Sequence, residues 1–544
     1  MRISNPILPG TYPDPSICRV EEWFYLVSST FEHLPGLPVH RSRDLLSWEP
    51  IGHVVHRPGM LDYAGVASSG GLYAPTIRFR YGVFWVVCTL VTGDAPGTGR
   101  GGTFVVTATD PAGPWSEPSW LDVDGIDPSL LVTSDGRMWA HGTRLAAEPA
   151  WEQQTEVWLR ELDPAARALV GPETVIWTGA LVGAVWAEGP HLYEIDGGFL
   201  LLAAEGGTDL HHAVCVARAD DVRGPYVGHR ANPVLTHRHL GRGAAVVGVG
   251  HADLVQADDG SWWAVLLAMR PYGGYHYPLG RETFLVPVTW EDGWPLFAPG
   301  TGLVPDVVDV PFAAEAVPGV TQGFASGPVP PGDTRWTAVR ALPGEVGRAV
   351  GRAWELPVRP ETLADVAVAS FLGVRQQHRD LDATLRLQVA DLVAGEEAGL
   401  AVRQSERDHA VLAVGRGGDR AADRTAGRAS GRAGGGGWQA RVVHRRSGVE
   451  HVTGPVPLDG AGDDVVLHLR VRGVEATFSA AVGDGDAVEI GAVDVRTLDS
   501  VSAGGFVGLW LGAFATSQGR ASTSVVRVEA LEYVPAVGVT GARG

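Results

Sequence analysis

Three acidic residues stand in matching contexts beside proline, and together they could carry out proton transfer. Asp14 lies between two prolines in the stretch 13–16, PDPS, and the tripeptide Asp-Pro-Ser returns at 127–129. A carboxylate relative of this tripeptide, Glu-Gly-Pro, stands at 188–190. Because the residue before a proline is pushed into extended geometry, Asp14 and Asp127 are not expected in helices. If the three acids face one pocket, they supply acid and base groups rather than a metal redox centre.

Three carboxyl groups in one cavity suit the hydrolysis of a glycosidic bond. That reaction needs one protonated carboxyl that donates to the leaving oxygen and one ionised carboxylate opposite it. A third acid nearby raises the pKa of the donor through like-charge repulsion. A separation of roughly 6.5–9.5 Å leaves room for a water and predicts inversion, whereas about 5 Å predicts retention. The alternative is that each acid only caps a turn beside its own proline or glycine.

An internal repeat could bring these acids together. A glycine, any residue and two bulky apolar residues recur from Gly82, Gly136, Gly197 and Gly260, with a weaker first copy at Glu22. The copies follow at intervals of about 60 residues, and an apolar run typical of a β-strand follows each copy. Five such units predict a five-bladed β-propeller. A large β-sandwich is the alternative, but it does not require a repeat of this length.

The repeat predicts a ring of five residues around the propeller axis. Tyr73, Asp127, Glu188 and His251 each stand nine residues before a repeat glycine, and Asp14 stands eight residues before the first copy. Matching positions in the blades are related by rotation about the axis, so these side chains are expected to line one funnel. Turn capping alone does not account for three acids in register with a histidine and an aromatic residue.

Further motifs lie around these residues in the N-terminal half: NPILPGTYPDPS at 5–16, STFE at 29–32, SRDL at 42–45, APTIR at 74–78, EGPHLY at 188–193, GHAD at 250–253 and GRETF at 280–284. Together they resemble glycoside hydrolase family 43, in its β-xylosidase and α-L-arabinofuranosidase branch. The resemblance implies an all-β chain, with a five-bladed β-propeller followed by a concanavalin-like β-sandwich domain.

The resemblance also implies roles for the polar candidates. Asp14 would be the general base that activates water, and Glu188 would be the general acid. Asp127 would raise the pKa of Glu188 and hold it in place. Arg281 would bind sugar hydroxyls and influence the carboxylates, with a salt bridge to Glu282 as the alternative.

Substrate-binding residues follow from the same resemblance. Phe31 would form part of the wall around the non-reducing sugar, and Tyr73 stands where relatives usually have Trp, so its hydroxyl could alter the sugar preference. His251 matches a funnel histidine that contacts a bound calcium ion or its waters in some relatives; a packed or hydrogen-bonding role is the alternative. No cofactor is expected to be required, and calcium is left open. Phe506 is a candidate for a residue that shortens the pocket. The alternative is that it packs in a hydrophobic core.

Length and composition predict more than one domain. The chain has 544 residues, of which 73 are Gly, 37 Pro and 18 Trp, a mixture typical of turns and aromatic-rich strands. We expect a propeller at 1–310, a proline-containing linker at 311–335 and a sandwich at 336–544, where alternating runs at 383–389 and 465–471 predict strands. The Gly/Ala/Arg-rich run at 415–437 is expected to be a surface loop.

Charge and cysteine content exclude several partners. A formal net charge of -19 argues against nucleic acid and anionic membrane surfaces, which require clustered Lys and Arg. No stretch is apolar enough for a membrane span or a signal peptide. Cys18, Cys88 and Cys215 are odd in number and far apart, which favours a reducing compartment. A cytoplasmic protein is therefore expected, and a homo-oligomer is left open.

These observations predict an exo-acting, inverting glycosidase that removes terminal xylose from β-1,4-linked xylo-oligosaccharides. α-L-Arabinofuranosidase activity on an arabinose-containing oligosaccharide, alone or combined, is the alternative within the class. A non-catalytic carbohydrate-binding propeller is the alternative from another class. It would keep the aromatic residues but would not need three acids in register.

Overall fold

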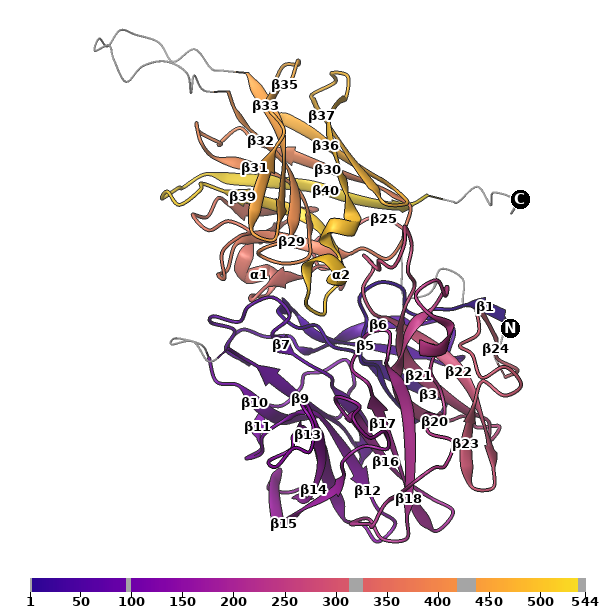
Figure 1. Ribbon diagram of the computed structural model, residues 1–544. Coiled ribbons are helices and arrows are strands. Elements are labelled where there is room, and N and C mark those ends of the chain that lie inside the picture. Colours follow the sequence, from indigo (N-terminus) through magenta and orange to yellow (C-terminus); the bar gives the residue numbers. More distant parts are fainter. Residues whose placement is uncertain (1, 94–98, 313–325, 418–436, 537–544) are drawn as a thin grey trace. The chain divides into compact units, whose positions relative to one another are not determined.

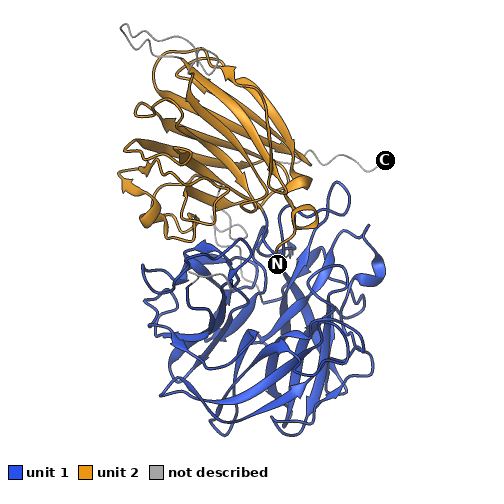
Figure 2. Ribbon diagram, turned by 60° about the vertical axis from the view of Figure 1, so that its left-hand side comes forward, with its two compact units in different colours: residues 1–325, 506–508 blue, residues 326–505, 509–544 orange. Residues whose placement is uncertain are grey.

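The structure, a computed structural model, describes residues 2–93, 99–312, 326–417 and 437–536. The chain divides into two compact units (Figure 2): unit 1 is Met1–Ala325 with Phe506–Gly508, and unit 2 is Ser326–Gly505 with Leu509–Gly544. Residues 313–325 of the expected linker and 418–436 of the expected surface loop lie outside the described residues. In the described part of the chain, no helix combines the length and apolar character that a membrane crossing needs.

Unit 1 contains five antiparallel sheets, whose strands follow one another along the chain (Figure 1). The first two sheets contain β2 (Ser16–Val20), β3 (Trp23–Val27), β5 (Gly36–Ser42) and β6 (Glu49–Val55), then β8 (Thr76–Arg80), β9 (Val83–Val91), β10 (Gly102–Ala108) and β11 (Ser119–Trp120). The third contains β12 (Ile126–Val132), β13 (Met138–Leu145), β14 (Thr155–Asp163) and β15 (Ala168–Trp177). The last two contain β16 (Glu188–Ile195), β17 (Gly198–Glu205), β18 (Ala213–Ala219) and β19 (Val227–Gly228), then β20 (Val247–Gln256), β21 (Trp262–Met269), β22 (Glu282–Glu291) and β23 (Trp294–Phe297).

One strand of each sheet contributes to a closed ring; in the second sheet this strand is β8, which follows the short strand β7 (Gly71–Leu72). Strand β2 contacts β8, β8 contacts β12, β12 contacts β16, β16 contacts β20, and β20 contacts β2 again. Rotation of equivalent sheets about one axis is the architecture of a propeller. The predicted five-bladed β-propeller is confirmed.

The repeat glycines form the turn between the first and second strands of four blades. Gly82, Gly136, Gly197 and Gly260 have φ angles of 75°, 86°, 74° and 84°, in the left-handed region that a residue with a Cβ rarely adopts. In the first blade, Glu21 takes this conformation with φ 53°. The sequence repeat therefore follows from the backbone geometry of one recurrent turn.

The N-terminal residues close the propeller against its last blade. Strand β1 (Arg2–Ser4) pairs with β24 (Val307–Asp309), and Leu8 forms a bridge with Thr283. The Asn5 amide nitrogen donates to the backbone oxygens of Leu285 and Pro305, both at 2.9 Å, and the Leu285 N–H donates back to Asn5 Oδ1. The buried side chain of Asn5 therefore links the start of the chain to the last blade and to the residues that follow this blade.

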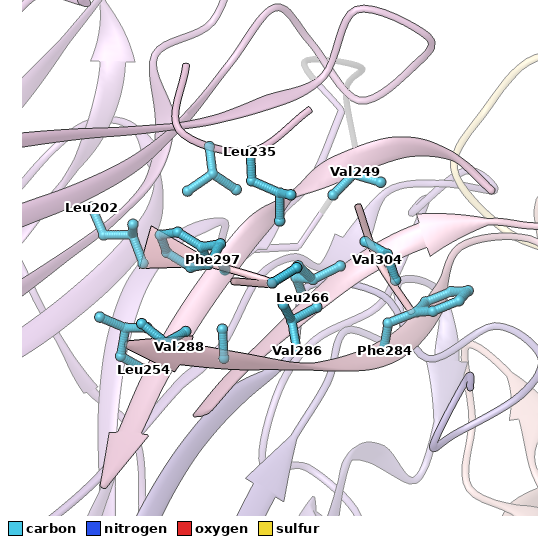
Figure 3. Close-up of a cluster of buried hydrophobic side chains, with 14 of the residues drawn as sticks. Leu202, Leu235, Val249, Leu254, Leu266, Phe284, Val286, Val288, Phe297 and Val304 are labelled. Carbon is cyan, nitrogen blue, oxygen red and sulfur yellow. The ribbon is translucent and has the colours of Figure 1, made fainter. Parts of the chain in front are cut away.

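Apolar side chains fill the space between the fourth and fifth blades. Figure 3 shows Leu202 of β17, Leu254 of β20, Leu266 of β21 and Phe284 of β22 pointing into one cluster. Each is at least 95% buried, and burying one such side chain stabilises the folded state by about 1.5–3 kcal/mol. The sheets that carry the functional residues therefore rest on a packed, rigid support.

Unit 2 is a β-sandwich, as predicted. Its two antiparallel sheets face each other, since β39 contacts β28 and β40, and β31 contacts β30 and β36. One sheet contains β27 (Arg348–Val350), β28 (Ala353–Pro357), β40 (Val525–Pro535), β30 (Leu381–Gln388), β36 (Asp464–Arg472), β37 (Glu475–Val482) and β38 (Val488–Asp494). The other contains β29 (Ser370–Arg375), β39 (Trp510–Thr516), β31 (Glu397–Arg403), β32 (His409–Arg416), β33 (Trp438–Arg446) and β34 (Val449–Val452). The short helices α1 (Pro343–Val346) and α2 (Ser500–Ala503) belong to the same unit.

Candidate active site

The candidate acids lie where innermost strands begin, and His251 lies in the middle of β20. Asp14 precedes β2 by two residues, whereas Asp127 and Glu188 lie in the first residues of β12 and β16. Asp14, Asp127 and His251 have φ angles of 55°, 52° and 51°. In β12, β16 and β20 the pairing register shifts beside these residues. Such irregularities re-aim side chains at functional sites, and Asp tolerates the left-handed conformation better than most residues.

In two blades, the residue expected in the ring lies one position away from the structural equivalent of Asp14. Counted from the hairpin turns, the position equivalent to Asp14 is Ala74 in the second blade and Gly189 in the fourth. Tyr73 and Glu188 therefore each precede the equivalent position by one residue. The backbone conformation agrees, because Gly189 has a φ of 54°, like Asp14, Asp127 and His251.

Asp14 is a buried carboxylate held by a cation. The Nη1 of Arg281 donates to Asp14 Oδ1 at 2.8 Å and its Nη2 donates to Oδ2 at 3.4 Å. The Ser29 hydroxyl donates to Asp14 Oδ2 at 2.6 Å, and His251 Nδ1 lies 3.8 Å from Oδ1. Asp14 is only 5% exposed. Charge-assisted hydrogen bonds of this kind fix the direction of the Asp14 carboxyl group.

Asp127 connects the third blade to the fourth. Its Oδ2 accepts a hydrogen bond from the backbone N–H of Gly189 at 3.0 Å, directly after Glu188 in the chain. Burial raises the pKa of Asp127, and the charge of Asp14 raises it further, while His251 and the Gly189 N–H act in the opposite direction. Asp127 is therefore placed to act on Glu188 both electrostatically and through the backbone.

Glu188 is in an environment that keeps its proton. The residue is half-buried, and burial of its carboxyl group raises its pKa well above the usual value. The charges of Asp127 and then Asp14 raise the pKa further, and Arg281 opposes them. Glu188 can thus donate a proton, while Asp14, paired with Arg281, can accept one. Two carboxyl groups whose environments push their protonation states apart are the pattern of an acid/base pair.

Arg281 does not pair with its sequence neighbour. The carboxylate of Glu282 accepts hydrogen bonds from both Nε and Nη2 of Arg270, each at 2.7 Å. Arg281 instead binds Asp14, because successive residues of an extended chain point to opposite sides and the side chain of Glu282 therefore points away from that of Arg281. The alternative pairing of Arg281 with Glu282 is wrong.

Three aromatic rings line the same site. The ring centroids of Phe31 and Tyr73 lie 5.4 Å apart, and Phe506 stacks on Phe31 at 6.1 Å and meets Tyr73 edge-on at 6.1 Å. The Arg281 guanidinium carbon lies 5.5 Å from the centroids of both Phe31 and Phe506. The Tyr73 hydroxyl donates to the Ser69 carbonyl at 2.8 Å, and burial raises the pKa of Tyr73 to about 12. This hydroxyl therefore stays protonated and held by the backbone.

Phe506 belongs to a short segment that is part of unit 1. The Phe506 N–H donates to Ser69 Oγ at 2.9 Å, and the Gly508 N–H donates to Thr11 Oγ1 at 3.0 Å. A Cβ added at Gly280, whose φ is 80°, would lie 2.8 Å from Gly508 N. Phe506 keeps 37% exposure, so it is a wall residue rather than a core phenylalanine.

His251 packs tightly between the acids. A Cβ added at Gly189 would lie 2.8 Å from His251 Cε1, so only glycine leaves room for the imidazole there. Across the described ranges, no three side chains of His, Cys, Asp or Glu converge as a metal site would require. Asp14 is also already held by Arg281, so the residues present do not fit a protein cage for calcium. Calcium near His251 stays a prediction, and no chemical step below depends on it.

Sequence reasoning missed several polar residues that hold the site. Ser29 binds Asp14, and Thr208 Oγ1 accepts from Arg281 Nη1 at 3.2 Å. Ser69 anchors both Tyr73 and Phe506. Ser29 lies in the STFE motif and could have been suspected there. Thr208 and Ser69 lie in loops without any distinguishing pattern.

Comparison with known proteins agrees with this geometry. The family model described as glycosyl hydrolases family 43 matches residues 3–295, and that of the β-xylosidase C-terminal concanavalin A-like domain matches residues 352–534. A xylosidase/arabinosidase from Butyrivibrio fibrisolvens is 36% identical, over 95% of this chain and 96% of its own. A non-reducing end α-L-arabinofuranosidase from Bacteroides ovatus is 34% identical, over 96% of this chain and 92% of its own.

Solved structures give the same result. The crystal structure of a xylan β-1,4-xylosidase from Bacillus halodurans has a TM-score of 0.87 and 28% identity, and the match covers 98% of this chain and 100% of that chain. The matches extend through the propeller and the sandwich. With full-length relatives above 30% identity and a family model on each unit, this chain belongs to family 43 of the glycosyl hydrolases.

Proposed function

We propose that this glycoside hydrolase is an exo-acting, inverting β-xylosidase that releases terminal xylose from short β-1,4-linked xylo-oligosaccharides. The observation that carries the proposal is the contrast between two carboxyl groups in one site. Glu188 is kept protonated by burial and by Asp127, whereas Asp14 is held by the Arg281 cation. The relatives and the solved structure named above, which include xylosidases, support the choice of sugar.

Hydrolysis in such a site is one concerted displacement. Asp14 removes a proton from a water molecule, whose oxygen attacks the anomeric carbon. Glu188 gives its proton to the glycosidic oxygen as the bond to the leaving sugar breaks. Burial and then the charge of Asp127 keep the proton on Glu188 until that moment, and Arg281 orients Asp14 through two hydrogen bonds. Asp14 gains one proton and Glu188 loses one in this step. Exchange with solvent then removes the proton from Asp14 and returns one to Glu188.

Blade arrangement supports inversion. Asp14 precedes strand β2 and Glu188 begins β16, and in the closed ring strand β20 lies between these two strands. Acid and base are thus on non-adjacent blades, which favours the separation of about 6.5–9.5 Å that admits a water molecule. A single inversion at the anomeric carbon follows from attack on the face opposite the leaving group.

The aromatic wall supports action at a chain end. The rings of Phe31, Tyr73 and Phe506 form one aromatic wall beside Arg281, and Ser69 holds two of them through hydrogen bonds. Sugar rings stack on such apolar faces, while Arg281 offers donors to hydroxyl groups. A pocket closed on one side accepts a terminal residue and leaves no path for a continuing chain.

α-L-Arabinofuranosidase activity is the second candidate, because a relative that matches almost the whole chain carries that name. Xylopyranose and arabinofuranose present similar atoms, and the wall at Tyr73 can select between them. The Tyr73 hydroxyl is held by the Ser69 carbonyl, so it is expected to shape the pocket rather than to bind the sugar directly.

Parallel assays with 4-nitrophenyl β-D-xylopyranoside and 4-nitrophenyl α-L-arabinofuranoside test the proposal. We expect a larger kcat/KM for the xyloside, and we expect proton NMR to show α-xylose as the first sugar released from 4-nitrophenyl β-D-xylopyranoside. A larger kcat/KM for the arabinofuranoside would instead favour the second candidate. Initial release of β-xylose would contradict inversion, and binding without turnover of either glycoside would favour a carbohydrate-binding protein.

A further inference from the structure

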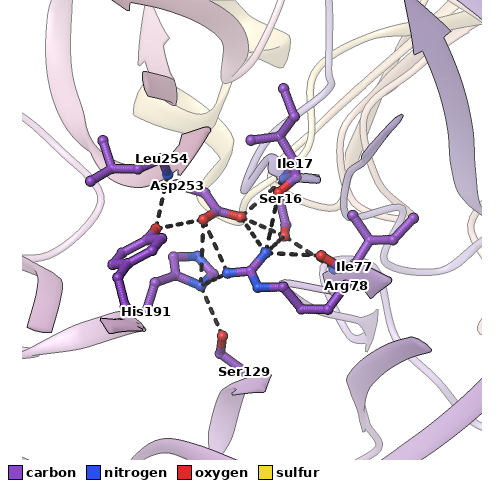
Figure 4. A network of polar contacts seen from close by, with 9 residues as sticks. Ser16, Ile17, Ile77, Arg78, Ser129, His191, Asp253 and Leu254 are labelled. Atoms are coloured by element: carbon purple, nitrogen blue, oxygen red, sulfur yellow. Dashed lines mark hydrogen bonds and ion pairs between the residues drawn. The ribbon is translucent and has the colours of Figure 1, made fainter. Parts of the chain in front are cut away.

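One polar side chain from every innermost strand joins a single network close to the candidate acids (Figure 4). We call this set the axial network; its members are Ser16 of β2, Arg78 of β8, Ser129 of β12, His191 of β16 and Asp253 of β20. All but Arg78 are at least 97% buried. None of these residues has a role in the mechanism above.

Asp253 is the centre of the axial network. Its Oδ2 accepts from Arg78 Nη1 at 2.8 Å, from Ser16 Oγ at 2.7 Å and from the Ile17 N–H at 3.0 Å. Its Oδ1 accepts from Arg78 Nη2 at 3.1 Å and from the Tyr193 hydroxyl at 2.6 Å. A bidentate Arg–carboxylate pair fixes direction as well as distance. The first, second, fourth and fifth blades thus meet at one carboxylate.

His191 brings the third blade into the network. Arg78 Nη2 lies 3.1 Å from His191 Nδ1, and Ser129 Oγ lies 2.9 Å from the same nitrogen. Because a guanidinium only donates, Nδ1 must be the acceptor, and the neutral imidazole carries its proton on Nε2. Burial lowers the pKa of His191 to about 3, which agrees with a neutral ring. The network therefore has defined donors and acceptors across all five blades.

The members of the axial network follow the acids closely along the chain. Ser16 comes two residues after Asp14, Ser129 comes two residues after Asp127, and His191 comes three residues after Glu188. Because only one or two residues separate the members of each pair, a displacement of the network residue carries over to the acid. Acid/base groups must be held within about 0.5 Å of their productive positions, and a misplacement of about 1 Å can cost about a hundredfold in rate.

We propose that the axial network is a positioning device that sets the distances between Asp14, Asp127 and Glu188 across three blades. The proposal rests on the acid and base roles given under the proposed function. Its members are positioning residues, because they act through the strands and not on the sugar. The competing explanation is that the network only stabilises the propeller.

Ser129→Ala is the sharpest test, because it removes the network's own hydrogen bond between the third and fourth blades and leaves the Asp253–Arg78 pair intact. Ser42→Ala is the matched control: Ser42 is equally buried and donates one side-chain bond, to Asp44 Oδ1 at 2.9 Å, in β5 outside the network. For Ser129→Ala we expect kcat on xylobiose to fall roughly tenfold to a hundredfold with KM unchanged. We expect a smaller loss on 2,4-dinitrophenyl β-xyloside, because its leaving group needs little protonation by Glu188.

The pH profile separates positioning from stability. Glu188 faces Asp127 from β12, Asp14 from the start of β2 and Arg281 from the start of β22. If Asp127 moves away in Ser129→Ala, Glu188 loses like-charge repulsion and gives up its proton at lower pH. The loss of kcat/KM on the alkaline side should then begin at lower pH than in the wild type. A purely structural role would lower thermal stability, reduce activity on both substrates equally and leave the pH profile in place.

Tyr193→Phe provides a second test if Ser129→Ala does not fold. It removes the bond to Asp253 Oδ1, and Tyr226→Phe is its control, since the Tyr226 hydroxyl donates to the Val222 carbonyl at 3.2 Å in the same blade. The same difference between xylobiose and the activated xyloside is expected. If Ser129→Ala or Tyr193→Phe folds and matches its control in substrate dependence and pH profile, the positioning role of the axial network is overturned, while the proposed function stands. A wild-type protein that hydrolyses neither glycoside would overturn the proposed function, and the device with it.

Discussion

At the scale of single residues, the site depends on giving chemically similar carboxyl groups different surroundings. Asp14 receives two nitrogens of Arg281 and the hydroxyl of Ser29. Burial of Glu188 raises its pKa, and the negative charges of Asp127 and then Asp14 raise it further. Burial and charged neighbours therefore give the two carboxyl groups different surroundings, and individual neighbours can be removed separately.

Glu188→Gln removes the proton donor while nearly preserving side-chain volume. Turnover of xylobiose should fall by about 10²–10⁴-fold, because general acid catalysis contributes a factor of this size. Isothermal titration with xylose should still detect binding. Glu194→Gln is the matched control on the same strand, since Glu194 is exposed and binds Ser134 instead. A similar loss in both variants would contradict the assignment of the acid.

The alkaline side of the pH profile should report Glu188. The raised pKa keeps its proton at pH values where an ordinary Glu, with a pKa of about 4.3, has lost it, and activity is lost as pH rises through the raised value. Asp127→Asn removes a negative neighbour, so this loss should begin at lower pH. It should still begin above the ordinary Glu value, because burial is the largest cause of the shift. Asp135→Asn, at an exposed turn of the same blade, should leave the profile unchanged; an unmoved profile in Asp127→Asn would count against the coupling.

At the scale of elements, strand starts and one inserted segment build the pocket. Irregular pairing at the beginnings of β12, β16 and β20 lets their first residues leave the sheet direction. The segment Phe506–Gly508 contributes an aromatic ring to the wall although it lies far along the chain. Its position depends on close backbone contact with Gly280.

Gly280→Ala should displace this segment. An added Cβ would lie 2.8 Å from both Gly508 N and Thr11 Oγ1, so the hydrogen bond between them cannot remain unchanged. We expect KM for xylobiose to rise roughly tenfold, as the loss of an aromatic contact of about 1.4 kcal/mol implies. Gly300→Ala controls for backbone strain, because its φ of 85° is similar and no atom lies within 4 Å of its added Cβ. Equal effects on KM would exclude a specific role of the segment.

At the scale of the whole molecule, closure of the propeller holds the ring of strands together. Asn5 binds Leu285 and Pro305, so one side chain links the start of the chain to its fifth blade and to the residues that follow it. Removing a buried group of this kind leaves donors and acceptors without partners, each costing about 1–3 kcal/mol.

Asn5→Ala should therefore lower the Tm of the propeller more than Asn232→Ala does. Asn232 makes two similar backbone bonds, to the N–H and carbonyl of Val216, but these lie within one blade. Scanning calorimetry of the full chain measures both variants. Equal decreases in Tm would mean that the hydrogen bonds of Asn5 stabilise only their surroundings and that closure of the propeller adds no further stability.

Local features of this protein were determined by the sequence alone. The repeat glycines were visible because each hairpin turn needs a left-handed residue, and that requirement acts on neighbours in the chain. The propeller, the sandwich strands at 383–389 and 465–471 and three acids in related contexts followed from such patterns. Family 43 membership followed because those motifs recur together.

Only the tertiary structure decided which partners these residues have. Arg281 binds Asp14, remote in the sequence, instead of adjacent Glu282, and the strand register places Glu188 one residue away from the expected ring position. The inserted ring of Phe506 and the axial network likewise depend on segments that meet only after the blades close. Backbone preferences are set by adjacent residues, whereas side-chain pairing across a closed ring is set by the accumulated geometry of every turn and bulge between the partners.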